Sequence, residues 1–441
     1  MLLEHGFVLT LDDAGTRGRL SVAVTDGRIG SVGPRAELRA KHPDLRRVDC
    51  RGRIIMPGLV NAHLHPDLHV LKGELEELGL HDWNGARRFN AAVDFLGTPA
   101  GAAVRRAAVR ASLAEAALSG TTCVGTYGVT SGSEAVCAEA LVEIGLRGSV
   151  TIRDADFGPR PAALTGDARR GPDGTDPLAP VYRLHAEEAL FQPELDAAAR
   201  AHGRGERLVM HAAETTTRLG IVRRRFGTTT VRLLERRGLL SPRTLLSHAV
   251  HVDTAEIDLI ARRGASIVVS PSAEMKLGDG TPPVHEMVAR GINVAIGTDA
   301  AVCNNATDMF IEMRMMGLYQ KLRYGAGAAP AEQILRMATA AGAAALGAGA
   351  GFGRLAAGTA ADLVMLDVNN PRMQPLVPDG EHSNLASNLV YAATGADVTD
   401  VMVGGRWIVR RRRLLTLDAR LLWRDLARSA RTMHAHMQQV T

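Results

Sequence analysis

Aromatic residues and cysteines are scarce in this 441-residue chain. Phe, Trp and Tyr together make up 4% of it. Proteins that stack single-stranded nucleic acid interleave aromatic with basic residues, so this composition argues against a nucleic-acid partner. The four cysteines form no C-x-x-C pair, which argues against a zinc ribbon, a redox dithiol and a disulfide framework.

Long apolar runs are also absent. No stretch is long enough to cross a bilayer, and Glu4, His5, Asp12 and Asp13 interrupt an N-terminus that would be apolar in a secretory signal. We therefore expect a cytoplasmic protein with no membrane partner. The net charge of +5 includes one dense basic run, RWIVRRRRLL at 406–415, which we interpret as a solvated face.

Strand-like and helix-like segments alternate through the middle of the chain. Helical patterns such as 102–118 and 284–290 lie between eight strand-like runs, at 58–65, 121–127, 147–153, 179–185, 207–214, 244–251, 265–271 and 293–300. Eight buried strands alternating with helices indicate a parallel sheet, and eight is the number that closes a (β/α)8 barrel. The Pro-, Gly- and Asp-rich stretch 159–180 is typical of an exposed loop, which we place over the top of that barrel.

The two ends of the chain have a different pattern. Residues 1–57 and 355–415 contain short alternating runs separated by glycine turns, which predicts antiparallel strands from both termini in one small β-sandwich. Residues 58–354 then form the barrel, and 416–441 form a C-terminal helix that packs on it. The predicted fold class is α/β, a TIM-like (β/α)8 barrel with a composite β-sandwich domain.

Histidines and a carboxylate occur where the predicted strands end, and in a (β/α) barrel the active site is built at that end of the strands. In the first strand, His63 and His65 alternate and so face the same side. The fifth strand ends at His211 and the eighth at Asp299. Three imidazoles and one carboxylate suit one Zn²⁺ ion, or Fe²⁺ as the alternative, with a place left for water.

Two further residues beside these strand ends complete a hydrolytic site. A metal ion lowers the pKa of bound water to about 7, and the resulting hydroxide needs partners for proton transfer. Glu214 is placed to move a proton to a ring nitrogen, His248 to orient the hydroxide and Asp299 to bond it. Each residue also has an ordinary explanation, such as a core histidine or a helix cap, but that explanation does not predict that all lie at strand ends.

The motifs around these residues resemble the amidohydrolase superfamily, in the branch of S-adenosylhomocysteine/methylthioadenosine deaminases, guanine deaminases and triazine hydrolases. The similar segments are MPGLVNAHLH, HAAE, SHAVH, KLGDGTPPV, GTDAAVCNNATDMFIEMR and GRLAAGTAADLVMLD, and they span almost the whole chain. The resemblance implies a barrel with a composite β-sandwich and a homo-oligomer such as a dimer. It also implies a proton shuttle, Glu214, with His248 as its partner, and the metal ligands His63, His65, His211 and Asp299.

Within that branch, two residues match substrate contacts. Trp83 matches a tryptophan that covers substrate in the adenosine-type deaminases, and His185 matches a substrate-contacting histidine of the fourth strand. The carboxylate that grips ribose in nucleoside-type members is replaced by Ala92, with Asp94 close by.

The seventh strand departs from the His-Asn-Pro-x-Ser-Asn pattern that is usual in the branch. Here VSPSAEM places Glu274 at the position of the second asparagine. Glu274 either faces the substrate or bonds Lys276 or the backbone, and ion pairs also bury carboxylates. If it faces the substrate, its acceptor oxygens favour a ring with N–H donors, and Ala92 removes the expected ribose clamp. We therefore predict that compact aminated heterocycles rich in N–H donors are turned over in preference to adenosine-type nucleosides.

The predicted function is therefore hydrolytic deamination of an aminated nitrogen heterocycle by metal-activated hydroxide, with release of ammonia. The alternative is the same chemistry with chloride or an alkylamine as the leaving group, or the opening of a cyclic amide. Cyclic-amide hydrolysis by two metals usually needs a bridging lysine, which VYRLH at 181–185 lacks. A metal-bound scaffold without turnover is disfavoured because no residue of the predicted site is missing.

Overall fold

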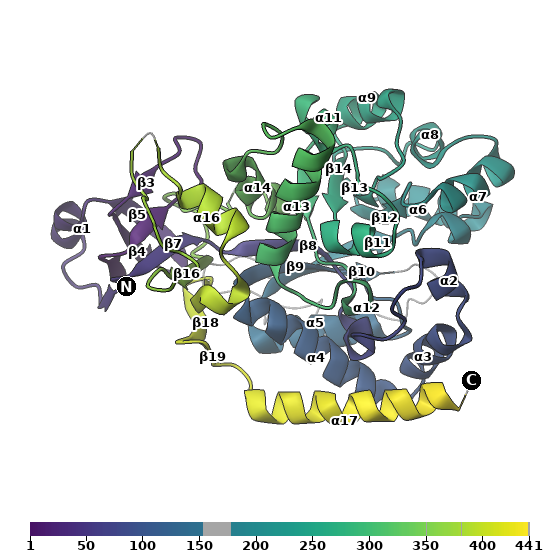
Figure 1. The fold of residues 1–441 in the computed structure, drawn as a ribbon, viewed down its shortest axis with the longest axis horizontal. Coiled ribbons are helices and arrows are strands. Elements are labelled where there is room, and N and C mark those ends of the chain that lie inside the picture. The colour runs from purple at the N-terminus through teal and green to yellow at the C-terminus, as the bar shows by residue number, and fades with distance from the viewer. Residues whose placement is uncertain (153–177, 350, 381, 440–441) are drawn as a thin grey trace.

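The computed structural model describes residues 1–152, 178–349, 351–380 and 382–439. Its centre is an eight-stranded parallel sheet whose strands pair in chain order, each with the next (Figure 1). The strands are β8 (Leu59–Leu64), β9 (Thr121–Thr126), β10 (Arg147–Ile152), β11 (Leu178–Arg183), β12 (Leu208–Ala212), β13 (Thr244–His248), β14 (Ser266–Val269) and β15 (Val294–Ile296). The predicted TIM-like barrel is thereby confirmed. Residues 159–177 of the expected loop lie outside the described part of the chain. Its last three residues, 178–180, belong to β11.

The barrel closes through the segment that follows β15. The backbone amides of Thr298 and Asp299 donate to the carbonyl oxygen of His63, at 3.1 and 2.9 Å. The amide of Asn61 in β8 donates to the Thr298 hydroxyl at 2.7 Å. This closure brings Asp299 to the end of the first strand, next to the histidines there.

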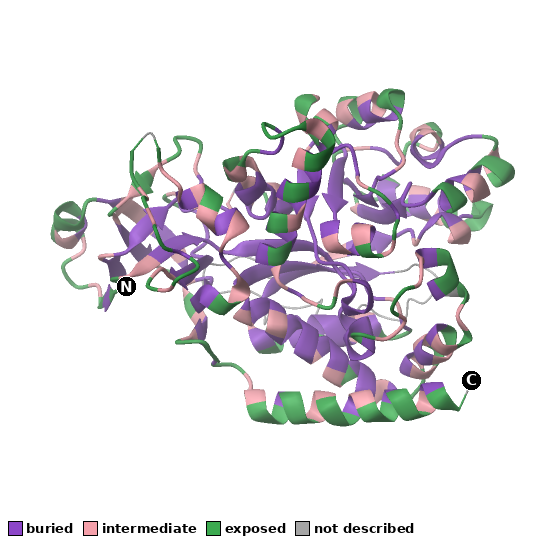
Figure 2. Cartoon of the chain, viewed as in Figure 1, coloured by how far each residue is buried: buried purple, intermediate pink, exposed green. Residues whose placement is uncertain are grey.

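Helices connect the strands and cover the outside of the barrel. They are α4 (Ala102–Leu118), α5 (Ser133–Ile144), α6 (Gln192–Gly203), α7 (Thr216–Phe226), α8 (Thr230–Arg236), α9 (Thr254–Arg263), α10 (Pro271–Lys276), α11 (Val284–Ala289), α12 (Ala301–Asn304), α13 (Met309–Tyr324), α14 (Ala331–Met337) and α15 (Ala340–Ala345). Their inner faces and the strands are buried, while their outer faces are exposed (Figure 2). The predicted helices at 102–118 and 284–290 correspond to α4 and α11.

Local sequence explains where several of these helices begin and end, and α9 is a clear example. The Asp253 side chain accepts from the backbone N–H of Glu256 at 2.9 Å, and the Glu256 side chain accepts from that of Asp253 at 3.0 Å. This reciprocal pair satisfies two N–H groups that the first turn leaves unbonded. The helix ends at Gly264, whose φ of 69° lies in the left-handed region that glycine adopts at low cost.

Strands from both termini form two further sheets on one side of the barrel (Figure 1). The smaller has the order β5-β4-β1-β6 and the larger β19-β18-β17-β16-β7-β2-β3. Their bounds are β1 (Leu2–Glu4), β2 (Phe7–Leu9), β3 (Arg17–Gly18), β4 (Ser21–Thr25), β5 (Arg28–Gly33), β6 (Arg47–Asp49), β7 (Arg53–Pro57), β16 (Leu363–Asp367), β17 (Val398–Val403), β18 (Arg406–Arg410) and β19 (Arg413–Leu414). Two short helices, α1 (Arg35–Lys41) and α16 (Leu385–Tyr391), flank them.

The two terminal sheets share one hydrophobic core. Leu3, Val22 and Ile29 of the smaller sheet pack with Ile55, Leu363 and Met402 of the larger. The N- and C-terminal segments join at the antiparallel pair of β7 and β16. A composite of both termini was predicted, whereas the domain boundaries at residues 57, 355 and 415 stay predictions.

Not all of these strands are antiparallel, which corrects the prediction. β1 pairs with β6 in parallel, and β2 pairs with β7 in parallel. The chain passes from the smaller sheet to the larger one twice in the same direction, once after β1 and once after β6. β1 and β6 therefore run in the same direction in the smaller sheet, and β2 and β7 do so in the larger sheet. At the first crossing, a Cβ on Gly6 would lie 2.9 Å from Ile55 Cδ1, so only glycine fits without a shift.

The C-terminal helix α17 (Ala419–Gln438) lies along α4 and α3 (Arg87–Gly97) at the base of the molecule (Figure 1). It begins at Asp418, whose carboxylate accepts from two backbone N–H groups of the first turn. Met433 and Met437 are buried against Leu96 and Val104. The helix therefore supports α3, which, with α2 (Leu80–Gly85) and the 3₁₀ helix η1 (Pro66–Leu71), lies over the barrel mouth.

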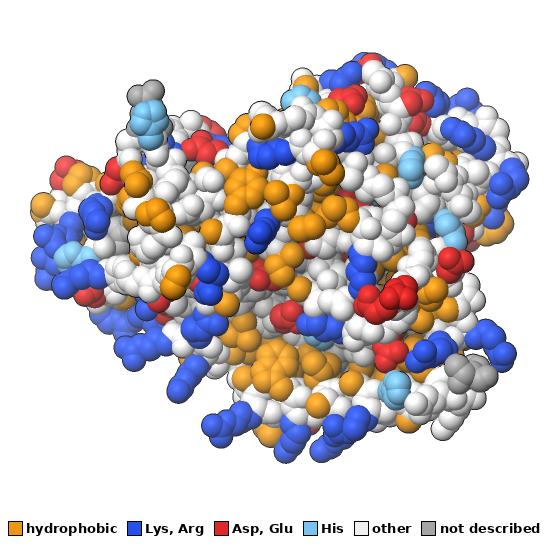
Figure 3. Space-filling view, viewed as in Figure 1, with side chains coloured by type: hydrophobic (Ala, Val, Ile, Leu, Met, Phe, Trp, Pro, Cys, Tyr) orange, Lys and Arg blue, Asp and Glu red, His pale blue; other side chains and the backbone are white. Residues whose placement is uncertain are grey.

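The surface carries basic and apolar side chains side by side. Around β19 and α17 at the lower edge, Lys and Arg side chains surround hydrophobic ones (Figure 3). The basic run at 406–415 forms β18 and β19, and Arg411, Arg412 and Arg413 are exposed. All four cysteines are buried and unpaired. Among the described residues, no helix combines the length and apolarity needed to span a membrane.

A buried ion pair joins the barrel to the terminal sheets. Arg147, at the start of β10, contacts Asp362 in two places: Nε lies 2.7 Å from Oδ2 and Nη2 lies 3.2 Å from Oδ1. The side chains are only 5% and 6% exposed, and the Gly404 N–H also donates to Asp362 at 2.6 Å. Removing the arginine would therefore leave a buried carboxylate without its countercharge.

Arg147→Met is expected to lower the free energy of unfolding by about 3–5 kcal/mol, the range for breaking a buried pair from one side. Denaturant unfolding followed by circular dichroism measures this loss. The control is Arg106→Met, which removes an exposed pair with Glu139 whose side chains are 60% and 55% exposed. That pair should contribute no more than about 1 kcal/mol. Equal losses in the two variants would contradict the role of the buried pair.

Candidate functional site

Three histidine side chains converge at the mouth of the barrel. His63 and His65 extend from the end of β8 and His211 from β12. The Nε2 atom of His211 lies 3.2 Å from the Nε2 atoms of both His63 and His65. His65 Nε2 also lies 3.3 Å from Asp299 Oδ1, and His63 Nε2 lies 3.9 Å from it. The residues predicted as metal ligands are thus brought together.

The opposite ring nitrogens show which proton each imidazole carries. His65 Nδ1 faces the carbonyl oxygen of Tyr127 at 2.7 Å, and His211 Nδ1 faces that of His185 at 3.1 Å. A carbonyl oxygen only accepts, so both Nδ1 atoms carry the proton and both Nε2 atoms present lone pairs. His63 Nδ1 lies 3.3 Å from the Ser247 hydroxyl. Such contacts behind a ring orient it toward a metal ion.

This arrangement fits a metal ion on physical grounds. Two lone pairs that face each other at 3.2 Å repel unless a cation lies between them. Zinc–nitrogen bonds of 2.0–2.1 Å in a tetrahedral site put neighbouring nitrogens about 3.3–3.4 Å apart, close to the separation found here. Burial also lowers the pKa of His63 and of His211 well below the usual value, so these rings stay neutral and able to bind.

The backbone at these strand ends is strained. Ala213, His248, Ala249 and Asp299 have φ values of 53°, 74°, 51° and 60°, in the left-handed region that non-glycine residues seldom adopt. Each such residue costs on the order of 1–3 kcal/mol and persists only where the surroundings impose it. Other non-glycine residues with positive φ lie elsewhere in the chain, but these four lie at the ends of β12 and β13 and beyond β15, beside the predicted site residues.

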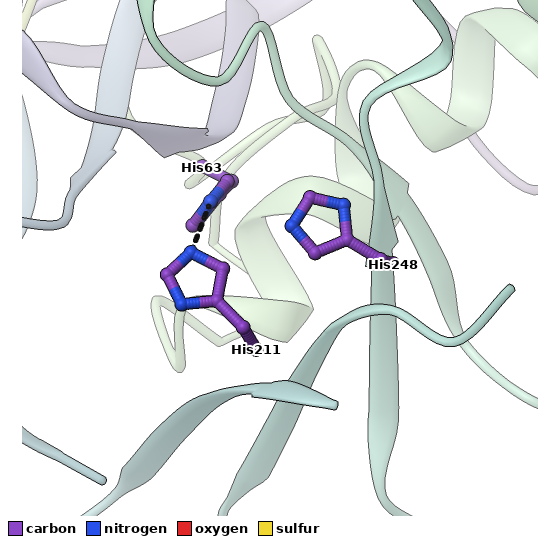
Figure 4. Close-up of side chains that lie close together, drawn as sticks. All are labelled: His63, His211 and His248. Carbon is purple, nitrogen blue, oxygen red and sulfur yellow. Dashed lines mark hydrogen bonds between the residues drawn. The ribbon is translucent and has the colours of Figure 1, made fainter. Parts of the chain in front are cut away.

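His248 stands beside the histidine cluster, with its ring facing His63 and His211 (Figure 4). Its Nε2 lies 3.7 Å from Glu214 Oε1 and 3.8 Å from Asp299 Oδ2. Burial would lower the pKa of His248, but Glu214 and then Glu274 and Asp299 outweigh it and raise that pKa to about 10. These carboxylates favour the charged form of the ring, in which Nε2–H donates toward the centre of the site.

Glu274 lies behind His248. Its Oε1 atom is 3.3 Å from His248 Nδ1 and accepts from the backbone N–H of Ser270 at 2.8 Å. The side chain is 1% exposed and does not belong to the cavity lining, whereas Lys276 pairs with Glu76 instead. The sequence left two hypotheses for Glu274, contact with the substrate or a bond within the protein. This geometry supports the second, and the side chain that it contacts is His248, which the sequence did not suggest.

A cavity opens above the histidine cluster. One wall is apolar and holds Trp83 and Phe89, whose rings lie 4.4 Å apart, with Leu68, Leu80 and Leu277 beside them. The other wall is polar and contains His185 and Glu214. Both residues predicted to contact substrate from the resemblance, Trp83 and His185, therefore line the cavity.

Three cavity residues with ionisable side chains were not singled out as site residues in the sequence. Glu188 and Arg218 lie in the polar wall, and Cys303 lies beside Asp299. Arg218 follows Glu214 by four residues, the spacing at which two side chains on a helix meet. That spacing was the available signal, whereas nothing local in the sequence links Arg218 to Glu188.

Comparisons with known proteins agree with this geometry. Residues 54–408 match the model of the Amidohydrolase family, and 22–44 match an imidazolonepropionase-like composite domain of bacteria. The 5-methylthioadenosine/S-adenosylhomocysteine deaminase of Syntrophobacter fumaroxidans is 34% identical over 452 residues, with 98% of each chain covered. The 5'-deoxyadenosine deaminase of Methanosarcina mazei is 30% identical over 454 residues, with 99% of each covered.

A solved structure extends the likeness to three dimensions. An adenosine deaminase from Xanthomonas campestris with bound zinc is 28% identical and superposes with a TM-score of 0.86, with 98% of each chain covered. The matching family model spans most of the chain and includes every residue predicted to bind metal or carry protons. The chain belongs to the amidohydrolase family.

Proposed function

We propose that this protein is a metal-dependent hydrolase that removes the amino group of a purine-like nitrogen heterocycle and releases ammonia. The observation that carries the proposal is the convergence of three imidazole Nε2 atoms and Asp299 at the floor of a cavity that also contains Glu214 and His248. Relatives named as deaminases, aligned over nearly the full chain, support the same reaction.

In the proposed reaction, water adds to the ring carbon that bears the amino group. When bound, a divalent ion supplies a Lewis acid and lowers the pKa of water to about 7. Glu214 takes the proton from water and passes it to the adjacent ring nitrogen, and His248 stabilises negative charge on the attacking oxygen. The proton of the new hydroxyl then moves to the amino group, the C–N bond breaks, ammonia leaves, and a carbonyl remains on the ring.

We further propose one zinc ion per chain, held by His63, His65, His211 and Asp299, with iron(II) as the alternative. Zinc in the adenosine deaminase structure supports the choice of metal. β11 reads LAPVYR and so offers no lysine to bridge a second ion. We also propose a cytoplasmic homo-oligomer, in the simplest case a dimer, whose mass light scattering would measure.

The substrate is proposed to be a compact base rather than a nucleoside. Ala92, at the position of the ribose-gripping carboxylate, is fully buried in the hydrophobic core. Asp94 lines a neighbouring hollow with Val93 and Gly97 and is not among the residues that line the cavity with Trp83. No side chain of α3 thus offers a carboxylate to a sugar in the part of the cavity that the structure describes.

An ammonia-release panel tests both the reaction and the substrate class. At equal concentrations, compact aminopurines, aminopyrimidines, aminotriazines and pterins are expected to be turned over faster than adenosine, methylthioadenosine or adenosylhomocysteine. In Glu274→Gln the order of preference should not change, since Glu274 contacts His248 rather than the cavity. Preference for the nucleosides would refute the substrate claim, and no ammonia from any compound with metal-loaded protein would refute the reaction.

A further inference from the structure

A row of ionisable side chains, each in contact with the next, crosses the site from its mouth to its interior. They occur in the order Glu188, Arg218, Glu214, His248 and Glu274. Glu188 is the exposed end, with 38% of its side chain accessible, and Glu274 is the buried end at 1%. Glu214, the proposed proton carrier, lies in the middle, between Arg218 and His248.

The two oxygens of Glu214 have different partners. Oε2 accepts from Nη1 of Arg218, whereas Oε1 faces Nε2 of His248 at 3.7 Å. Only Oε1 is therefore left on the side of the histidine cluster, where a proton has to be moved. A glutamate side chain can adopt several rotamers unless a contact selects one of them. The contact with Arg218 holds Glu214 in a single rotamer.

Arg218 is itself held in place from two directions. Its Nη2 donates to Oε1 of Glu188 at 2.5 Å, so the planar guanidinium bridges two carboxylates. Its backbone N–H donates to the Thr215 hydroxyl at the start of α7, at 3.1 Å. The side chain is only 7% exposed, although it lines the cavity.

The segment that carries Glu188 is fastened to the same region. It forms the 3₁₀ helix η4 (Glu187–Ala189), and Arg225 of α7 donates to the carbonyl of Glu188 at 3.0 Å. Glu187 Oε1 accepts from the backbone N–H of Ala213, the strained residue next to Glu214, and from the Thr230 hydroxyl at 2.9 Å. Glu188 thus offers Arg218 a fixed point of attachment.

We propose that Arg218 is a positioning residue that fixes the rotamer of Glu214, with Glu188 as its anchor. This inference rests on the proposed role of Glu214 as proton carrier. Arg218 holds Oε2 so that Oε1 alone carries the proton between water and the substrate ring. A lysine could neutralise charge and donate to both carboxylates, but its ammonium lacks the planar fork with which a guanidinium fixes the direction of each bond.

The proposal predicts that loss of Arg218 damages turnover rather than substrate binding. Misplacing a catalytic group by about 1 Å can cost about 10²-fold in rate, so kcat of Arg218→Ala should fall by that order with KM close to wild type. Arg218→Lys should recover only part of the rate. Methylguanidinium chloride should partly restore Arg218→Ala, while sodium chloride at the same concentration should not.

The matched control is Arg224→Ala, in the same helix but exposed and outside the cavity lining. It should keep the wild-type kcat and show no response to methylguanidinium. If Arg218→Ala does not fold, Glu188→Gln provides a second test, since it leaves Arg218 beside Glu214 and removes only the charge of the anchor. Glu188→Gln should lower kcat by a smaller factor than Arg218→Ala, again with little change in KM.

A double-mutant cycle separates this inference from the proposed function. With Glu214→Gln already in place, Arg218→Ala should cause little further loss, because the group that it positions is gone. An effect confined to KM, or one that changes with the substrate, would overturn the inference and assign Arg218 to substrate binding. If Arg218→Ala keeps the wild-type kcat while Glu214→Gln is inactive, the inference about Arg218 is refuted and the proposed function stands. If Glu214→Gln is active, the proposed function itself is refuted.

Discussion

Glu214→Gln is expected to lose at least about 10²-fold in turnover, the lower range for removal of a positioned acid–base group. The amide has the same shape and can still accept from Arg218 through its oxygen, but it cannot carry a proton between water and a ring nitrogen. Glu214 contacts Arg218 and His248 rather than the converging Nε2 atoms, so the metal content should stay near wild type. Steady-state rates of ammonia release and elemental analysis of the same sample measure the two quantities.

The matched control for that change is Glu139→Gln, in which the carboxylate is exposed on α5 and 55% accessible. Its turnover should equal that of wild type. A Glu214→Gln enzyme with the wild-type rate would show that the proton moves by another route. Loss of metal together with activity would instead place Glu214 among the ligands.

His63→Ala is expected to lose its bound metal and its activity together. The rate should fall by more than about 10³-fold, because a bound metal supplies several kcal/mol of transition-state stabilisation and each tenfold in rate is about 1.4 kcal/mol. The physical reason is that His63 Nε2 lies 3.2 Å from His211 Nε2, whose lone pair points into the cluster, so that both rings can hold the same cation. Wild-type protein stripped by a chelator should lose its activity and regain it with one equivalent of zinc per chain.

The control for the metal prediction is His285→Ala, because His285 is exposed on α11, away from the barrel mouth. It should retain both metal and rate. Two tightly held ions per chain, or full activity in metal-free protein, would contradict the single-ion site.

The barrel and its histidines could be predicted because the signals are local and repeated. The alternation of His63 and His65 in β8 has a period of two, and the spacing of eight apolar runs sets the number of strands. α4 lies where its apolar pattern places it, at Ala102–Leu118. In a parallel barrel every strand ends on the same side, so His211 and Asp299 could be brought to the same place from chain order alone.

The remaining features depend on contacts that chain order does not reveal. The parallel pairs β1–β6 and β2–β7 arise because the chain crosses twice between sheets, which an alternating pattern does not record. The orientation of Glu274 depends on α10, which begins at Pro271 and turns the carboxylate back to Ser270 and His248. Nor does any local pattern connect Glu188 with Arg218, since these side chains meet only after β11 and β12 pair.

The central claim is that water replaces an amino group on a heterocyclic ring, and isotope labelling tests it most directly. The substrate that releases ammonia fastest would be incubated with metal-loaded enzyme in water enriched in oxygen-18, and the product examined by mass spectrometry. We predict one labelled oxygen in the product for each ammonia released, with the ring intact. An unlabelled product, an opened ring, or release of another leaving group without ammonia would contradict hydrolytic deamination.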